Sequence, residues 1–178
     1  MCRPNNRSSD SPIMIRQFNT SDILTIVSKF AEHNWPKPIA TFERYLQEQC
    51  DGNRLIWVAY LNNQFAGYVT LAWMSKYQPF RDDKIPEIMD LNVLPPFRSC
   101  GIGSKLLEVA ETAAGFKNNY VGLGVGLYAD YGVAQKLYLK RGYIPDGRGI
   151  TYDYQFVLPG SSVRVDDDLL LWLLKQLK

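Results

Sequence analysis

The chain has 178 residues, of which 46% are hydrophobic and 21% are charged, and its formal net charge at pH 7 is +2. A chain of this length can bury a core of its own, and the composition is ordinary for a soluble globular protein. The small net charge and the lack of a basic stripe exclude a dedicated nucleic-acid-binding protein. No apolar run is long enough to cross a membrane, so we expect neither nucleic acid nor a membrane as a partner.

The cysteines give a further constraint on the class of protein. Cys2, Cys50 and Cys100 are odd in number, widely spaced and without a CxxC pair. This pattern predicts neither a disulfide framework nor a zinc site, and we expect no metal. The first residues contain no apolar segment of a signal peptide, so we expect a cytoplasmic protein.

The first half of the chain predicts a strand, two helices and a hairpin. Residues 1–12 are polar and include two prolines, so we expect a disordered leader followed by a single domain over residues 13–178. The predicted elements are a strand at 13–18, a helix capped by Thr20 or Ser21 with Ile23, Ile26, Val27 and Phe30 on one face, a helix at 41–50 ending near Gly52, and strands at 54–61 and 64–74 around Asn62 and Asn63.

The second half predicts strands that alternate with helices. The predicted elements are a polar loop at 75–86, a strand at 87–94, a helix from near Gly103, a strand at 120–125, a helix at 132–141 ended by Gly142, and a final segment at 168–177. As a helix the final segment would be apolar on all sides, so a buried strand is preferred. The order β-α-α-β-β-β-α-β-α-β-β predicts an α/β fold, a mixed sheet with helices on both faces.

The stretch from Arg98 to Ser104 has little side-chain bulk just before a predicted helix. Gly101 and Gly103 allow a ligand to approach the backbone, and consecutive N–H groups at a helix N-terminus bind anions. The Arg98 guanidinium can add a charge-assisted contact to phosphate. A dinucleotide fingerprint fails because Leu106 stands where its third glycine belongs, and a Walker loop fails because no GK[ST] follows. A simple glycine-containing turn is the other interpretation of the glycines alone.

Two motifs resemble the GNAT superfamily of N-acetyltransferases. The stretch Arg98-Ser99-Cys100-Gly101-Ile102-Gly103 is similar to the R/Q-x-x-G-x-G/A motif of that family, and AQKLYLKRGY at 134–143 resembles its A-x-x-L-Y-x-x-x-G-F/Y segment. The order of the elements over residues 13–178 also matches. The resemblance implies the GNAT fold, a mixed and mostly antiparallel sheet of six to seven strands with helices on both faces, splayed between its fourth and fifth strands.

The resemblance also implies acetyl-CoA as the cosubstrate and a set of residues that hold it. Leu91 and Val93 match the strand that binds the pantetheine arm, and the Val93 N–H would stabilise the oxyanion that forms on the thioester carbonyl. Tyr131 is counted with the cofactor residues, although it stands where the family often has asparagine. The pyrophosphate would lie on Arg98, Ser99, Cys100, Gly101, Ile102, Gly103 and Ser104.

Acetyl transfer to an amine requires a base and an acid. An alkylamine with a pKa of about 10.4 is almost wholly protonated at neutral pH, and the departing thiolate leaves more easily if it gains a proton. Tyr138 matches the family's tyrosine acid. Glu87 matches the carboxylate that several members use as the base, with Asp90 as second choice and a water chain as a further alternative. On a regular strand these two carboxylates would face opposite sides.

Each candidate also has a structural interpretation. Tyr138 could be a packed core tyrosine, and the carboxylates could be ordinary strand residues. Cys100 is interpreted as structural rather than nucleophilic, because the only histidine, His33, is remote in the sequence.

The sequence thus predicts an acetyl-CoA-dependent N-acetyltransferase that acts on a primary amine, by direct attack on the thioester and with a small-molecule acceptor. The alternatives are a protein N-acetyltransferase and a noncatalytic acyl-CoA-binding or sensing module. A homodimer is compatible with these features, and the identity of the acceptor amine is left open.

Overall fold

The computed structural model describes residues 12–177, so the predicted leader at 1–12 lies almost entirely outside the described residues. The chain divides into two compact units. The first contains the residues up to Ala72 together with Asp90–Thr112, and the second contains Trp73–Met89 and the residues from Ala113 onward. Strand β4 and helix α4 each contribute to both units, and the prediction of one domain over 13–178 stays a prediction. No helix in the described part of the chain is long and apolar enough to span a membrane.

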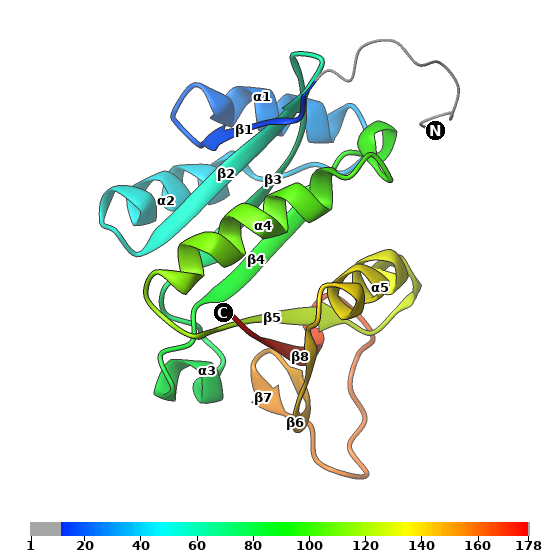
Figure 1. The fold of residues 1–178 in the computed structure, drawn as a ribbon. Coiled ribbons are helices and arrows are strands. Elements are labelled where there is room, and N and C mark those ends of the chain that lie inside the picture. The colour runs from blue at the N-terminus through cyan, green and yellow to red at the C-terminus, as the bar shows by residue number, and fades with distance from the viewer. Residues whose placement is uncertain (1–11, 178) are drawn as a thin grey trace. The chain divides into compact units, whose positions relative to one another are not determined.

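The elements follow the predicted α/β order, with one additional helix and one additional strand (Figure 1). They are β1 (Met14–Gln17), α1 (Asp22–Ala31), α2 (Ile39–Cys50), β2 (Arg54–Leu61), β3 (Gln64–Ala72), α3 (Gln78–Asp82), β4 (Glu87–Val93), η1 (Pro95–Phe97), α4 (Ile102–Gly115), β5 (Tyr120–Gly126), η2 (Ala129–Tyr131), α5 (Gly132–Lys140), β6 (Ile144–Tyr152), β7 (Gln155–Phe156) and β8 (Leu169–Gln176).

The strands form a mixed sheet in the order β1-β2-β3-β4-β5-β8-β6-β7. β4 and β5 run parallel, whereas the other pairs whose registers are resolved are antiparallel. The predicted mixed, mostly antiparallel sheet is therefore confirmed. Its count of six to seven strands is too low, because the described residues form eight. The additional strand β7 has only two residues, too few to produce an alternating pattern in the sequence.

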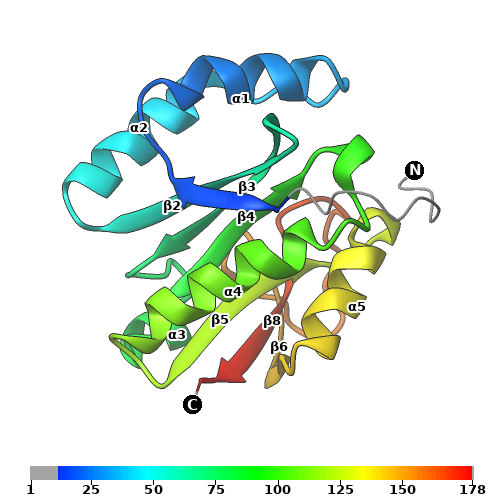
Figure 2. The same ribbon diagram turned by 45° about the horizontal axis from the view of Figure 1, so that its top comes forward.

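In the first unit, α1 and α2 cover one face of the strands and the start of α4 lies on the other face (Figure 2). The predicted apolar face of α1 is confirmed, since Ile23, Ile26 and Phe30 are buried. The core between these two helices and the sheet is largely aromatic. Its buried members are Phe18, Ile23, Ile26, Phe30, Phe42, Tyr45, Ile56, Val58, Phe65, Tyr68 and Leu94.

The predicted hairpin is confirmed, and its turn explains why two asparagines stand there. Asn62 and Asn63 have φ of 52° and 61°, the left-handed conformation that a two-residue hairpin turn requires at both central positions. Asparagine tolerates this conformation better than most residues. The turn fixes the register that pairs Leu61 with Gln64.

Two local predictions in this part of the sequence need correction. Helix α1 does begin directly after Ser21, but the Ser21 hydroxyl donates to Asn19 Oδ1 at 2.6 Å and does not cap the helix. The polar loop expected at 75–86 contains the short helix α3, with Tyr77 and Phe80 buried beneath it. Tyr77 and Phe80 are too close together in the sequence to reveal a helical period, because α3 has only five residues.

In the second unit, β8 lies between β5 and β6 and pairs antiparallel with both. The final segment is therefore a strand, as predicted, and its Trp172 is fully buried. The Trp172 ring stacks on Tyr77 with the ring centres 4.1 Å apart, and Phe80 meets Trp172 edge-on. Helix α5 ends at Lys140, and Gly142 follows with φ of 87°, as expected of a left-handed helix terminus.

A partly buried ion pair fastens β1 to the start of α1. Both oxygens of Asp22 accept hydrogen bonds from Arg16, at 2.7 and 2.6 Å, and the Asn19 amide and the Tyr60 hydroxyl add two more, at 2.9 and 3.0 Å. Burial alone would raise the pKa of Asp22, but these donors outweigh it and the pKa is lowered.

We predict that Asp22→Asn lowers the free energy of unfolding by about 1–2 kcal/mol at pH 7, because Arg16 is partly exposed and part of the pair is screened. The contribution of Asp22 is present above the unfolded pKa of about 3.9 and is lost as pH falls through the lower folded pKa. Urea unfolding of both proteins should therefore converge in acid. Glu32→Gln, which breaks an exposed ion pair with Lys29, is the control and should change stability by less than about 0.5 kcal/mol. An equal effect of the two variants would contradict the prediction.

Candidate functional site

The segment between β4 and α4 has the backbone of an anion-binding loop. Ser99 and Gly101 have φ of 63° and 82°, so two residues of this short segment are in the left-handed conformation. Left-handed residues in a short loop can turn neighbouring N–H groups toward one side. Helix α4 then begins at Ile102, and its first amides have no acceptor within the helix. The loop predicted from the glycines therefore has the geometry of an N–H cradle.

Glycine is required at position 101 because of the backbone conformation there, and not because a side chain would collide with a neighbour. A Cβ placed on Gly101 would meet only the Ile13 side chain, at 3.9 Å. Any L-residue is strained at a φ of 82°, however. The exposure of Arg98, Ser99 and Gly101 leaves this side of the loop open to a ligand.

Arg98 lies beside this loop and is oriented by the first unit. Its Nε donates to the Val93 carbonyl at 3.3 Å, and its guanidinium carbon lies 6.0 Å from the centre of the Trp35 ring. No carboxylate among the described residues forms an ion pair with Arg98. The guanidinium therefore keeps charge available for an anion such as phosphate.

Strand β4 carries four of the predicted site residues, and it is not regular. Asp90 has φ of 51°, so the alternation of side chains is broken there. The expectation that Glu87 and Asp90 face opposite sides assumed a regular strand, and β4 is not regular at Asp90. The ladder between β4 and β5 contains one resolved pair, Glu87 with Gly122, and Leu91 and Val93 are half-buried further along the strand.

Glu87 is a buried carboxylate of the second unit. Only 3% of the residue is exposed, and its Oε2 accepts a hydrogen bond from the Ser75 hydroxyl at 2.6 Å. The Ser75 oxygen in turn accepts from the Tyr77 amide at 3.0 Å, which fixes the direction of its own donor. Sequence reasoning did not find Ser75, because it lies in a segment that resembles a solvated loop.

Tyr138 lies on α5, in the second unit, and is almost fully buried. Burial raises the pKa of its hydroxyl, so the group stays protonated at neutral pH. Its ring meets Tyr143 edge-on, with centres 5.9 Å apart, and no hydrogen bond of its hydroxyl is found among the described residues. A protonated hydroxyl without a fixed acceptor is compatible with a proton donor.

Tyr131 is anchored within the second unit. Its hydroxyl donates to Asp167 Oδ1 at 2.9 Å, and its ring covers Gly126, where an added Cβ would lie 2.4 Å from ring carbons. The Tyr128 hydroxyl donates to the same carboxylate. The Tyr131 hydroxyl is thus engaged by the protein, which leaves mainly the ring edge for a cofactor contact.

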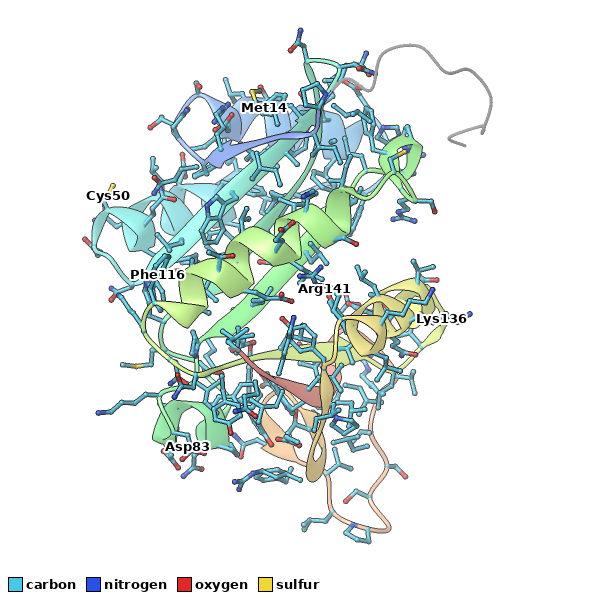
Figure 3. The ribbon with its side chains drawn as sticks, in the orientation of Figure 1. Met14, Cys50, Asp83, Phe116, Lys136 and Arg141 are labelled. Atoms are coloured by element: carbon cyan, nitrogen blue, oxygen red, sulfur yellow. The ribbon has the colours of Figure 1, made fainter. Side chains whose placement is uncertain are left out.

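Cys50 is free and projects from the end of α2 (Figure 3). The Cys100 sulfur lies 3.6 Å from the Arg98 carbonyl oxygen, which gives Cys100 no catalytic role. Among residues 12–177 there is no group of three potential metal ligands.

The fold resembles those of solved acetyltransferases. An N-acetyltransferase from Staphylococcus aureus Mu50 is 19% identical, with a TM-score of 0.68 over 94% of this chain and 100% of that one. The protein yncA of Salmonella typhimurium, solved with its cofactor acetyl-CoA, is 16% identical, with a TM-score of 0.68 over 94% and 95% of the two chains. A ribosomal-protein-alanine N-acetyltransferase from Brucella melitensis is 17% identical, with a TM-score of 0.67 over 92% and 99%.

The sequence itself defines the family. Residues 21–143 match the model of the acetyltransferase (GNAT) family, and this range contains both the loop before α4 and Tyr138. The chain belongs to the GNAT acetyltransferase family, as the two motifs predict. Among curated protein sequences, none matches this chain.

We predict that Gly101→Val weakens acetyl-CoA binding at least tenfold, because a branched residue at a φ of 82° forces the loop to rearrange. Gly52→Val is a matched control. Gly52 follows α2 in the same unit with φ of 74°, and a Cβ added to it would meet no atom within 4 Å. It carries similar strain, so both variants should lose similar stability, and only Gly101→Val should lose affinity in calorimetry. Unchanged affinity in folded Gly101→Val would refute the role of the loop.

Proposed function

We propose that this protein is an acetyl-CoA-dependent N-acetyltransferase that transfers an acetyl group directly to the primary amine of a small molecule. The observation that carries the proposal is the left-handed backbone at Ser99 and Gly101, immediately before α4 and inside the R-x-x-G-x-G motif. Membership in the GNAT family and the acetyl-CoA named with the yncA structure support the same cosubstrate.

Acetyl-CoA supplies the thioester, and the protein's own groups would hold its phosphates. In the proposed arrangement, the amides from Arg98 to Ser104 and the Arg98 guanidinium bind the pyrophosphate. Leu91 and Val93 bind the pantetheine arm through their backbone groups. The Val93 N–H then faces the thioester carbonyl, where it stabilises the negative charge that develops on oxygen during attack.

Glu87 and Tyr138 would handle the two protons of the reaction. The amine nitrogen forms a bond to the carbonyl carbon, the carbon–sulfur bond breaks, and the amine loses a proton to Glu87 directly or through water. The Ser75 hydroxyl donates to Oε2 of Glu87 and so helps to orient the carboxylate for that role. The protonated Tyr138 hydroxyl gives a proton to the departing sulfur.

A protein N-terminus is the alternative acceptor, because two of the matched structures are named as ribosomal-protein-alanine N-acetyltransferases. A noncatalytic acyl-CoA sensor is the alternative that is not an enzyme. Release of free thiol from acetyl-CoA across small amines, polyamines, aminoglycosides and peptides separates the three. Turnover with small amines supports the proposal, turnover with peptides alone favours the protein acceptor, and binding of acetyl-CoA without release of thiol favours the sensor.

A cytoplasmic location and a homodimer are further proposals, tested by fractionation and by light scattering.

We predict that Glu87→Gln lowers kcat/KM by on the order of 10²–10⁴ and flattens the acidic limb of the pH–rate profile, because the amide cannot accept the proton. Acetyl-CoA affinity should stay near that of the wild type, which calorimetry can measure. Glu108→Gln, on the exposed side of α4, is the control and should leave the profile unchanged. A larger loss in Asp90→Asn than in Glu87→Gln would move the base to Asp90.

We predict that Tyr138→Phe slows kcat by on the order of 10²-fold, about 2.7 kcal/mol, while the KM for acetyl-CoA changes little. The phenyl ring keeps the packing surface, and no hydrogen bond of the hydroxyl is found among the described residues, so stability should be nearly unchanged. Tyr128→Phe, in which a hydroxyl bound to Asp167 is removed from the same unit, serves as the control. Wild-type kcat in a folded Tyr138→Phe protein would restore the interpretation of Tyr138 as a packing residue.

A further inference from the structure

The backbone of Asp90 is in a conformation that a strand does not ordinarily contain. Its φ of 51° lies in the left-handed region, within the seven-residue strand β4, and the residue is not glycine. A non-glycine residue persists there only where its surroundings hold it. We call this feature the Asp90 kink, and the contacts around it identify what holds it.

Two side-chain groups of the described residues donate hydrogen bonds to Asp90. The Tyr45 hydroxyl, from α2, donates to Asp90 Oδ2. The Asn92 side-chain amide donates to the Asp90 carbonyl at 3.2 Å. Burial raises the pKa of Tyr45, and the neighbouring Asp90 carboxylate raises it further, so the phenol remains a donor. The side chain and the carbonyl of Asp90 are thus both engaged by hydrogen-bond donors.

Tyr45 is itself held rigidly. It is 5% exposed, and its ring lies below two guanidinium groups, with the Arg54 and Arg44 carbons 4.3 and 4.8 Å from its centre. Arg54 is fixed in turn by a hydrogen bond to Thr70 at 2.7 Å, and Phe42 meets the Tyr45 ring edge-on. The phenol therefore holds Asp90 from a fixed position.

Strand β3, which lies beside β4 in the sheet, also restricts the backbone of β4. A Cβ on Gly67 of β3 would lie 2.3 Å from the Asn92 carbonyl oxygen, so the two backbones touch at this point. One residue past Val93, the Leu94 amide donates to the Ala66 carbonyl at 2.9 Å. Val93 therefore lies on a short stretch of backbone that is fixed on both sides, by the kink before it and by β3 after it.

We propose that Tyr45 and Asp90 are positioning residues that hold the kink in β4 and thereby aim the Val93 N–H. The inference rests on the proposed function where it assigns that N–H to the thioester carbonyl. It also gives Asp90 a role other than that of the base, because its carboxylate is a hydrogen-bond acceptor for α2.

Substitution of Asp90 by asparagine separates the role of positioning residue from the role of general base. Asp90→Asn removes the charge but keeps a side-chain oxygen for the Tyr45 hydroxyl, and asparagine tolerates left-handed backbone well. Asp90→Ala removes both the oxygen and that tolerance. A positioning role predicts that Asp90→Asn keeps kcat within about threefold of the wild type, whereas Asp90→Ala and Tyr45→Phe lose about tenfold to hundredfold. A base would lose activity equally in Asp90→Asn and Asp90→Ala.

The experiment measures kcat and KM for acetyl-CoA in these variants, together with amide hydrogen exchange at Leu91, Asn92 and Val93. Tyr60→Phe is the matched control, because it removes another tyrosine–aspartate hydrogen bond, to Asp22, in the same unit. We expect kcat to fall at nearly constant KM, with exchange at these three amides at least tenfold faster in Tyr45→Phe than in Tyr60→Phe.

Two results would overturn the proposal. One is equal loss of kcat in Asp90→Asn and Asp90→Ala, and the other is equal exchange at the three amides in Tyr45→Phe and Tyr60→Phe. Should Tyr45→Phe fail to fold, the comparison of Asp90→Asn with Asp90→Ala decides by the same two measurements. If the wild type releases no thiol with any amine, the proposed function fails, and the exchange measurement still decides whether Tyr45 and Asp90 hold the kink.

Discussion

The hydrogen bond from Tyr45 to Asp90 is the contact on which the geometry of β4 depends. Left-handed backbone at a non-glycine residue is unfavourable by roughly 1–2 kcal/mol, so it survives only if tertiary contacts stabilise it by at least as much. Those contacts come from α2 on one face and from the bare backbone of Gly67 on the neighbouring strand. The strand that supplies the proposed oxyanion donor is thus shaped by residues remote from it in the sequence.

Two buried carboxylates of this protein, Asp22 and Glu87, have hydrogen-bond partners that fit distinct roles. Asp22 accepts four hydrogen bonds and fastens β1 to α1, a structural use of charge. Glu87 accepts one from Ser75, whose own orientation is fixed by the Tyr77 amide. Burying a carboxylate is costly unless donors satisfy it, and both acids accept hydrogen bonds from residues outside their own elements. The difference between the two sites is that Asp22 joins two elements of the scaffold, whereas Glu87 is the proposed base.

The glycines serve two separate physical needs. Gly101 is needed because its φ of 82° suits no other residue, although there is space for a side chain. Gly67, Gly122 and Gly126 have no such requirement, and each is needed because an atom of a neighbour lies where its Cβ would be. Gly122 leaves room for the Phe80 ring, and Gly126 leaves room for the Tyr131 ring. Only the first kind leaves an open surface, which is what a phosphate-binding loop requires.

Local patterns in the sequence determined much of the fold. The Asn62–Asn63 hairpin, the apolar face of α1, the glycine after α5 and the loop before α4 all depend on the conformational preferences of residues close in sequence, so they could be predicted. The family followed from the two motifs that include Gly101 and Tyr138, and the match over residues 21–143 confirms it. The roles of the site residues stay predictions.

Other features were decided by the tertiary structure alone. Helix α3 exists because Tyr77 and Phe80 pack against Trp172, which lies about ninety residues further along the chain, and five residues are too few to produce a period. Ser75 acquires its role from Glu87, and Tyr45 from Asp90, through contacts that no local pattern encodes. The kink at Asp90 goes against the preference of an aspartate in a strand. The sequence determined which backbone conformations were available locally, and packing between distant segments decided where an unfavourable one was stabilised.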